Sequence, residues 1–107
     1  MELGVEGKVA IITGGSEGIG RAAALRLSME GAKVAIVART QADLDRVAAQ
    51  ISAASGHEVI GVAADMRDED SVRTMVDAVV QRFGGVDILV NNAGTAIAGK
   101  FADMTNE

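Results

Sequence analysis

The residues best suited to chemistry in this sequence lie in one glycine-rich segment, residues 13–20, which reads TGGSEGIG. The segment follows the apolar run Val9–Ile12 and precedes an alanine-rich stretch. In such a strand-to-helix turn, Gly14 permits the tight turn, Gly18 lets the backbone approach a phosphate, and Gly20 lets the helix pack closely. The N–H groups that open the helix can then bind phosphate oxygens, helped by the helix dipole. The segment therefore predicts a nucleotide-binding turn.

Further polar residues follow the other apolar runs, and Asp65 is the first of them. In open α/β sheets, ligands bind beyond the carboxyl ends of the strands, so such residues are expected near the glycine-rich turn. The carboxylate of Asp65 can accept a hydrogen bond from the amino group of an adenine. The alternative is a cap on the following helix, although Asp68 and Ser71 are better placed for that role.

Arg39 ends another apolar run, in the sequence Val37-Ala38-Arg39-Thr40. A carboxylate at this point would bind the 2′-hydroxyl of the adenosine ribose, whereas a basic residue would pair with a 2′-phosphate. The carboxylate is missing, so the sequence favours NADP over NAD. The alternative is that Arg39 is a solvated turn residue.

The elements that must position these residues follow from hydrophobic patterning. Four nearly continuous apolar runs are typical of parallel strands covered on both faces, and the segments between them carry helical periodicity. The strands are expected at 8–13, 33–38, 58–64 and 86–91, and the helices at 18–30, 41–55 and 69–83. This alternation predicts an α/β Rossmann-type, doubly wound parallel sheet with strand order 3-2-1-4, in a single domain over residues 1–107.

Composition excludes several other classes of protein. The chain has 107 residues, a formal net charge of −5, one histidine, and no cysteine, tyrosine or tryptophan. These counts argue against a nucleic-acid partner, a stacking platform and a multi-histidine or thiolate metal site. No apolar run is long enough for a membrane span, and no secretion signal opens the chain, so a cytoplasmic location is expected. His57 is expected on a surface loop, away from the crevice.

Three motifs together resemble the classical short-chain dehydrogenase/reductase family. They are T-G-x-x-x-G-x-G from Thr13, Asp65 followed by the apolar Met66, and Asn91-Asn92-Ala93-Gly94 at the end of the fourth strand. The resemblance covers essentially the whole chain, which corresponds to a truncated form of the family's seven-stranded fold. The cofactor-binding residues expected from the motifs and from the Arg39 argument are Thr13, Gly14, Ser16, Glu17, Gly18, Ile19, Gly20, Arg39, Asp65, Met66, Asn92, Ala93 and Gly94.

The resemblance also assigns roles to particular residues. It implies that Asp65 contacts adenine and that Asn92 contacts the ribose region of the cofactor. Asn91 is expected instead to brace the first and fourth strands near Thr13. Both amides have the alternative role of bonding the turn backbone. Many NADP-preferring members carry a basic residue where this chain has Glu17, and a carboxylate near a 2′-phosphate is unfavourable unless it points away.

The activity that the resemblance implies is hydride transfer between nicotinamide and a carbonyl or alcohol substrate, for example a 3-oxoacyl thioester, a sugar or a small alcohol. The family's general acid/base is a tyrosine four residues before a lysine, and this chain has no tyrosine. It is therefore expected to hold the cofactor half of the enzyme and no catalytic residue, and the resemblance implies that the enzyme is a homo-oligomer, a dimer or tetramer. The alternatives are a non-catalytic nucleotide-binding module and a regulator that has lost catalysis. The apolar strand Ile88–Val90 is expected to promote self-association if it remains an edge.

Overall fold

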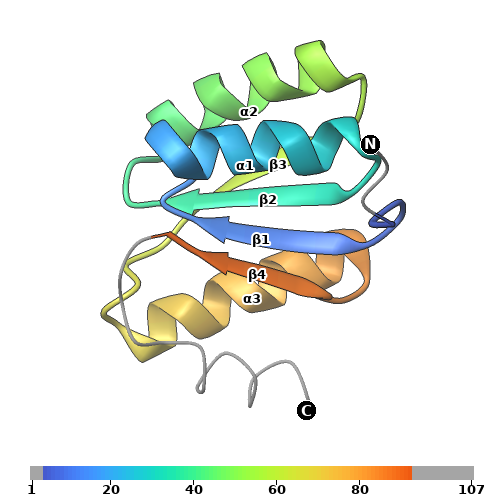
Figure 1. Cartoon of the computed structure of the whole chain (residues 1–107). Coiled ribbons are helices and arrows are strands. Elements are labelled where there is room, and N and C mark those ends of the chain that lie inside the picture. The colour runs from blue at the N-terminus through green and yellow to red at the C-terminus, as the bar shows by residue number, and fades with distance from the viewer. Residues whose placement is uncertain (1–3, 93–107) are drawn as a thin grey trace.

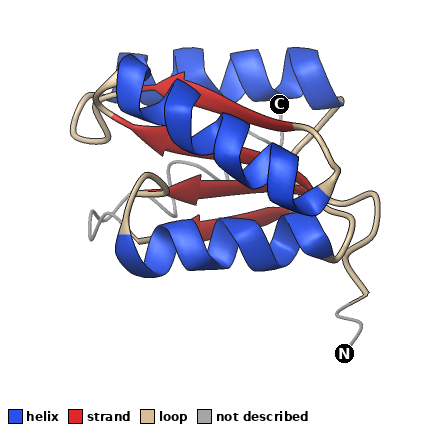
Figure 2. Cartoon of the chain, turned by 90° about the horizontal axis from the view of Figure 1, so that it is seen from above, coloured by secondary structure: helices blue, strands red, loops and turns tan. Residues whose placement is uncertain are grey.

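Four parallel strands form the middle layer of the structure, a computed structural model that describes residues 4–92. The strand order is β3-β2-β1-β4, as the sequence predicted. Helices α1 and α2 cover one face of the sheet and α3 covers the other (Figure 1). Seen from above, the sheet lies between its two helical layers (Figure 2).

The elements follow the predicted order, and their bounds agree with prediction to within two residues. They are β1 (Val9–Thr13), α1 (Gly18–Met29), β2 (Lys33–Ala38), α2 (Gln41–Ser55), β3 (Val59–Ala63), α3 (Glu69–Phe83) and β4 (Ile88–Asn91). The fourth strand starts two residues later than expected, and Asp87, which precedes it, bonds to Val9 through both its side chain and its backbone. Its side chain accepts a hydrogen bond from the N–H of Val9 at 2.9 Å, while its own N–H donates to the carbonyl of Val9 at 2.8 Å.

The register of the sheet brings the predicted site residues to one edge. Thr13 is aligned with Val37 of β2 and with Asn91 of β4, so β1 and β4 end at the same level and β2 ends one residue later. The arrowheads of these strands point the same way in Figure 1. The turns that leave them therefore adjoin one another at the carboxyl end of the sheet.

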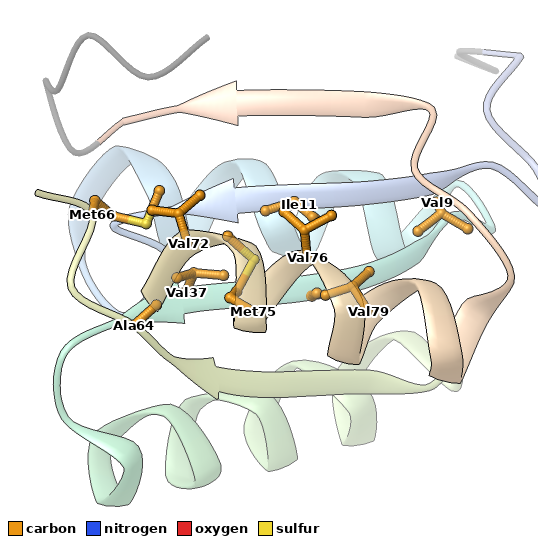
Figure 3. Packing of buried hydrophobic residues seen from close by; sticks show 10 residues of the cluster. Val9, Ile11, Val37, Ala64, Met66, Val72, Met75, Val76 and Val79 are labelled. Carbon is orange, nitrogen blue, oxygen red and sulfur yellow. The ribbon is translucent and has the colours of Figure 1, made fainter. Parts of the chain in front are cut away.

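Side chains from alternate strand positions build two hydrophobic cores, one on each face of the sheet. Ile11 packs toward α3 and Ile12 toward α1 and α2, and both are fully buried. Figure 3 shows Val72, Met75 and Val76 of α3 against the strands. Burying each such side chain contributes about 1.5–3 kcal/mol. Because β1 is buried on both faces, it forms a firm base for the turn that follows it.

The third helix begins at a well-defined cap. The side chain of Asp68 accepts hydrogen bonds from the N–H of Asp70 at 3.0 Å and of Ser71 at 3.5 Å. Gly84 ends the helix with a φ of 93°, in the left-handed conformation that glycine adopts readily. These two features confirm the predicted ends of α3, and they leave Asp65 free of the capping role.

Two further findings concern the surface. His57 is exposed and lies just before β3, at the amino end of the sheet, as predicted. Within residues 4–92, none of the helices combines the length and the apolar character that crossing a bilayer requires.

Candidate functional site

The glycine-rich turn leaves β1 and is attached to β2. Gly14 has a φ of 69°, which glycine adopts without the strain of a side chain. Its N–H donates to the carbonyl of Val37 at 2.7 Å. Gly18 has a φ of 57°, and a Cβ built on it would meet nothing within 4 Å. The turn is therefore tight at Gly14 and open above Gly18, as the motif predicted.

At Gly20, the first turn of α1 lies in close contact with the glycine-rich turn that precedes it. A Cβ on Gly20 would lie 2.2 Å from the carbonyl oxygen of Gly14 and 2.9 Å from Nδ2 of Asn92. Gly15 is also constrained, because its Cβ would lie 2.7 Å from the Cβ of Ile36. The requirement at Gly15 was not predicted, since it arises from a packing partner on β2 and not from the motif.

The helices that start beside the glycine-rich turn and beside Arg39 lack side-chain caps. Glu17 is the N-cap of α1 and Thr40 is the N-cap of α2, and neither side chain makes a capping hydrogen bond. In contrast, α3 is capped by Asp68. The first N–H groups of a helix have no partner within the helix. The uncapped starts of α1 and α2 therefore offer donors to an anion at the carboxyl end of the sheet.

Asn91 and Asn92 tie the end of β4 to β1. The hydroxyl of Thr13, which is fully buried, donates to Oδ1 of Asn91 at 2.9 Å. This contact confirms that Asn91 braces the two strands. Nδ2 of Asn92 donates to the carbonyl of Gly14 at a longer 3.5 Å, so this amide contacts the turn backbone. The structure thus places Thr13 as a positioning residue beneath the turn.

A hollow of about 320 Å³ lies next to the turn, between the ends of β2 and β3. We refer to it as the Arg39 hollow. Its lining residues are Gly14, Val37, Ala38, Arg39, Ala64, Asp65, Met66 and Arg67. Four of the predicted residues, Gly14, Arg39, Asp65 and Met66, therefore meet in one place. Its volume is at the lower end of the range for small-molecule sites, about 300–1,000 Å³.

The side chain of Met66 belongs mainly to the core. It is 8% exposed and packs with Val72 in the cluster beneath α3 (Figure 3). A direct contact between this side chain and a ligand is therefore limited to its edge. An apolar residue after Asp65 is explained by packing as well as by binding.

Asp65 is held by Arg67, a residue that the sequence reasoning missed. Oδ1 of Asp65 accepts hydrogen bonds from the backbone N–H of Arg67 at 3.0 Å and from its Nε at 3.1 Å, and Oδ2 accepts from a terminal guanidinium nitrogen at 3.3 Å. The side-chain hydrogen bond from Arg67 is the largest cause that lowers the pKa of Asp65 below its usual 3.8. The only signal for Arg67 in the sequence is its place two residues after the aspartate.

Glu17 lines a different hollow, of about 290 Å³, together with Arg21 and Arg46. Arg39 lines the first hollow and Glu17 the second, whose lining also includes Gly18 and a second carboxylate, Asp43. Ser16 also lines the second hollow, while the side chain of Ile19 is 78% exposed at the start of α1. Ala93 and Gly94, two of the predicted cofactor residues, lie outside the described residues.

The arrangement fits a dinucleotide. The close turn, in which a Cβ on Gly20 would collide with backbone, and the uncapped start of α1 suit a pyrophosphate. The hollow, with one carboxylate and two guanidinium groups, suits a nucleoside. Among residues 4–92, no group of three or more histidine, cysteine, aspartate or glutamate residues could hold a metal ion.

Comparisons with known proteins agree with this reading. The short chain dehydrogenase family profile matches residues 8–107. An uncharacterized oxidoreductase of Methylorubrum extorquens is 42% identical over 103 residues, which are 96% of this chain and 42% of that protein. The chain thus spans about two fifths of the length of this relative.

Two solved structures carry information on cofactors. L-sorbose reductase from Gluconobacter frateurii, complexed with NADPH and L-sorbose, has a TM-score of 0.83 and 45% identity, over 89% of this chain and 36% of that one. An NAD⁺-bound xylitol dehydrogenase has a TM-score of 0.75 and 35% identity, over 80% of this chain and 33% of that one. Both cofactors therefore occur among the structures that this chain is similar to.

Proposed function

The chain belongs to the short-chain dehydrogenase family, and we propose that it is the NADP(H)-binding part of an oxidoreductase that acts on a carbonyl or alcohol substrate. The observation that carries the cofactor preference is the composition of the Arg39 hollow. At the end of β2 this hollow has Ala38 and Arg39, with no carboxylate to hold a ribose 2′-hydroxyl or to repel a 2′-phosphate.

Different residues of the chain bind different parts of the dinucleotide. The open backbone at Gly18 and the first N–H groups of α1 receive the pyrophosphate, and the Arg39 hollow receives the adenosine end. Asp65 accepts a hydrogen bond from the base, and Thr13 with Asn91 fixes the ends of β1 and β4 beneath it. When bound, the nicotinamide supplies the hydride-transfer chemistry.

Arg39 supplies selectivity through its charge. Its side chain is exposed, so it can reach a 2′-phosphate at the mouth of the hollow. A hydrogen bond to a charged group contributes about 1.5–3 kcal/mol, which is roughly ten- to a hundredfold in affinity. Glu17 lines the other hollow, with Arg21, Asp43 and Arg46, and does not line the Arg39 hollow, which supports a 2′-phosphate site away from its carboxylate.

The substrate is a carbonyl or alcohol compound such as a 3-oxoacyl thioester, a sugar or a small alcohol, and the whole protein is a homo-oligomer. The likeness to L-sorbose reductase supports this substrate class.

The presence or absence of a Tyr-x-x-x-Lys motif downstream of residue 107 would distinguish an enzyme from a non-catalytic nucleotide-binding module. Because this chain has no tyrosine, we expect it to bind cofactor without turnover.

Isothermal titration of the chain with NADP⁺ and NAD⁺ at fixed ionic strength tests the proposal, since salt screens such contacts. Arg39→Ala should weaken NADP⁺ binding roughly ten- to a hundredfold and leave NAD⁺ nearly unchanged. Adding Ala38→Asp should then reverse the preference. Arg26→Ala is a matched control, because Arg26 lies in the last turn of α1, at the opposite end of the sheet. Equal weakening of both cofactors by Arg39→Ala would remove the support for NADP.

A further inference from the structure

The contact between Asp65 and Arg67 fixes the carboxylate more firmly than a simple ion pair does. Both oxygens are engaged by the same guanidinium group, and one of them also accepts the N–H of Arg67. The backbone is held as well, because the N–H of Asp65 donates to Oγ of Ser71 at 2.9 Å and its carbonyl accepts from the N–H of Asp68 at 3.0 Å. Asp65 therefore presents its side chain in one defined orientation at the wall of the Arg39 hollow.

Counting acceptor positions shows what the fixed carboxylate can still do. An ionised carboxylate has about four lone-pair positions, two on each oxygen. Arg67 fills both positions on Oδ1 and one on Oδ2. Within the described part of the chain, one acceptor position on Oδ2 is left for a ligand. A single hydrogen-bond donor from a base can use it.

The charges around Asp65 ensure that this position accepts and does not donate. Arg67 lowers the pKa of the carboxyl through its hydrogen bonds, and the positive charge of Arg39 lowers it further. Asp65 is thus ionised at neutral pH and carries no proton to donate. A base with an exocyclic amino group forms a hydrogen bond here, whereas a carbonyl oxygen in the same place meets a negative charge.

We propose that Arg67 is a specificity-determining positioning residue, which holds Asp65 so that the hollow selects an amino purine over an oxo purine. In chemical terms, the site prefers an adenine dinucleotide to its hypoxanthine counterpart. This inference rests on the proposed function, because it assigns the base-recognition step of the same site. Arg67 acts through Asp65 and does not itself read the base.

The test compares NADP⁺ with deamino-NADP⁺, in which hypoxanthine replaces adenine, by isothermal titration of the 107-residue chain. The unaltered chain should bind NADP⁺ roughly ten- to a hundredfold more tightly, as expected for one hydrogen bond to a charged acceptor. Arg67→Ala should reduce this ratio by about three- to tenfold, because the carboxylate then turns and is solvated. Asp65→Asn should abolish the ratio, and in that background Arg67→Ala should change it no further.

Arg67→Lys separates geometry from charge. Lysine keeps the positive charge but lacks the planar fork that engages both oxygens, so it should restore little of the ratio. Full restoration by lysine would show that charge alone is sufficient and would overturn the positioning role. An equal loss of affinity for NADP⁺ and deamino-NADP⁺ in Arg67→Ala would also overturn it. So would weaker NADP⁺ binding with unchanged NAD⁺ binding, because that result would indicate a direct contact between Arg67 and the 2′-phosphate.

Failure of this inference is distinguishable from failure of the proposed function. If the unaltered chain preferred NADP⁺ to deamino-NADP⁺ and Arg67→Ala left that preference unchanged, only the role of Arg67 would be wrong. If the unaltered chain bound none of the dinucleotides while its far-ultraviolet circular dichroism showed a folded α/β domain, the proposed function would fail and the inference with it. Arg26→Ala serves again as the arginine control.

Discussion

Replacing Gly20 with alanine sets a gain in helix propensity against a collision. Alanine stabilises a helix interior by about 0.5–1 kcal/mol relative to glycine, and less in the first turn. However, the new Cβ would lie 2.2 Å from the carbonyl oxygen of Gly14 and 2.8 Å from its carbonyl carbon. Both atoms are backbone, so they cannot move aside as the end of a flexible side chain can.

Relief of this collision disturbs contacts that the turn depends on. The turn is anchored by the 2.7 Å hydrogen bond from the N–H of Gly14 to Val37, and Asn92 contacts it from the other side. Overpacking of this kind costs typically about 1–3 kcal/mol. The collision therefore outweighs the propensity gain, and we expect Gly20→Ala to destabilise the chain by roughly 1–2 kcal/mol and to weaken dinucleotide binding.

Two matched glycines separate the collision from other effects of a methyl group. A Cβ on Gly85 meets nothing within 4 Å, and its φ is not positive, so Gly85→Ala should be neutral or stabilise by about 0.4–1 kcal/mol. A Cβ on Gly18 also meets nothing, but its φ is 57°, so Gly18→Ala should cost about 1–2 kcal/mol through backbone strain alone.

Urea unfolding followed by far-ultraviolet circular dichroism is the suitable assay, because the chain has neither tryptophan nor tyrosine to report by fluorescence. The urea midpoint of Gly85→Ala should equal or exceed that of the unaltered chain, whereas the midpoints of Gly18→Ala and Gly20→Ala should be lower. If Gly20→Ala unfolded at the same urea concentration as the unaltered chain, the close approach of α1 to the turn would not be a constraint, and the reasoning would be refuted.

Three other changes test the supports of the site. Thr13→Val removes the buried hydroxyl that donates to Asn91 and should cost about 1–2 kcal/mol in urea unfolding, whereas Thr13→Ser, which keeps the hydroxyl, should retain the contact. Asp68→Ala removes the cap of α3 and should lower stability by about 1 kcal/mol, while Asp68→Asn, also a good cap, should cost less. The stability difference between the unaltered chain and Asp65→Asn should be constant at neutral pH. It should shrink in acid, because Arg67 lowers the pKa of this carboxyl in the folded state, so its contribution is lost as pH falls below the usual 3.8 through that lower value.

The sequence was sufficient for the strands and for the glycine-rich turn because the relevant forces are local or periodic. The continuous apolar run of β1 predicts a strand covered on both faces, and β1 is buried throughout. Position 14 needs a left-handed φ and position 20 has no room for a side chain, so their glycines were predictable from the motif alone.

The contacts that escaped prediction depend on how separate segments meet. Gly15 is required by Ile36, which comes from the neighbouring strand. Arg67 depends on the path of the turn after β3, which folds its guanidinium back onto Asp65. Met66 belongs to the motif and also to the hydrophobic core, and only the packing shows that its side chain is mostly buried. Such features follow from three-dimensional proximity, which a pattern along the chain does not record.

The pairing of β1 with β4 also determines when the site can form. Residues 13 and 91 are 78 positions apart, whereas β1 and β2 are joined through a single helix. Contacts between distant positions form more slowly, because a long loop must close first. On refolding, the first three strands should therefore gain protection from hydrogen exchange before the chain can bind a dinucleotide. On the ribosome, the glycine-rich turn emerges early, but the site forms only after the fourth strand has also emerged.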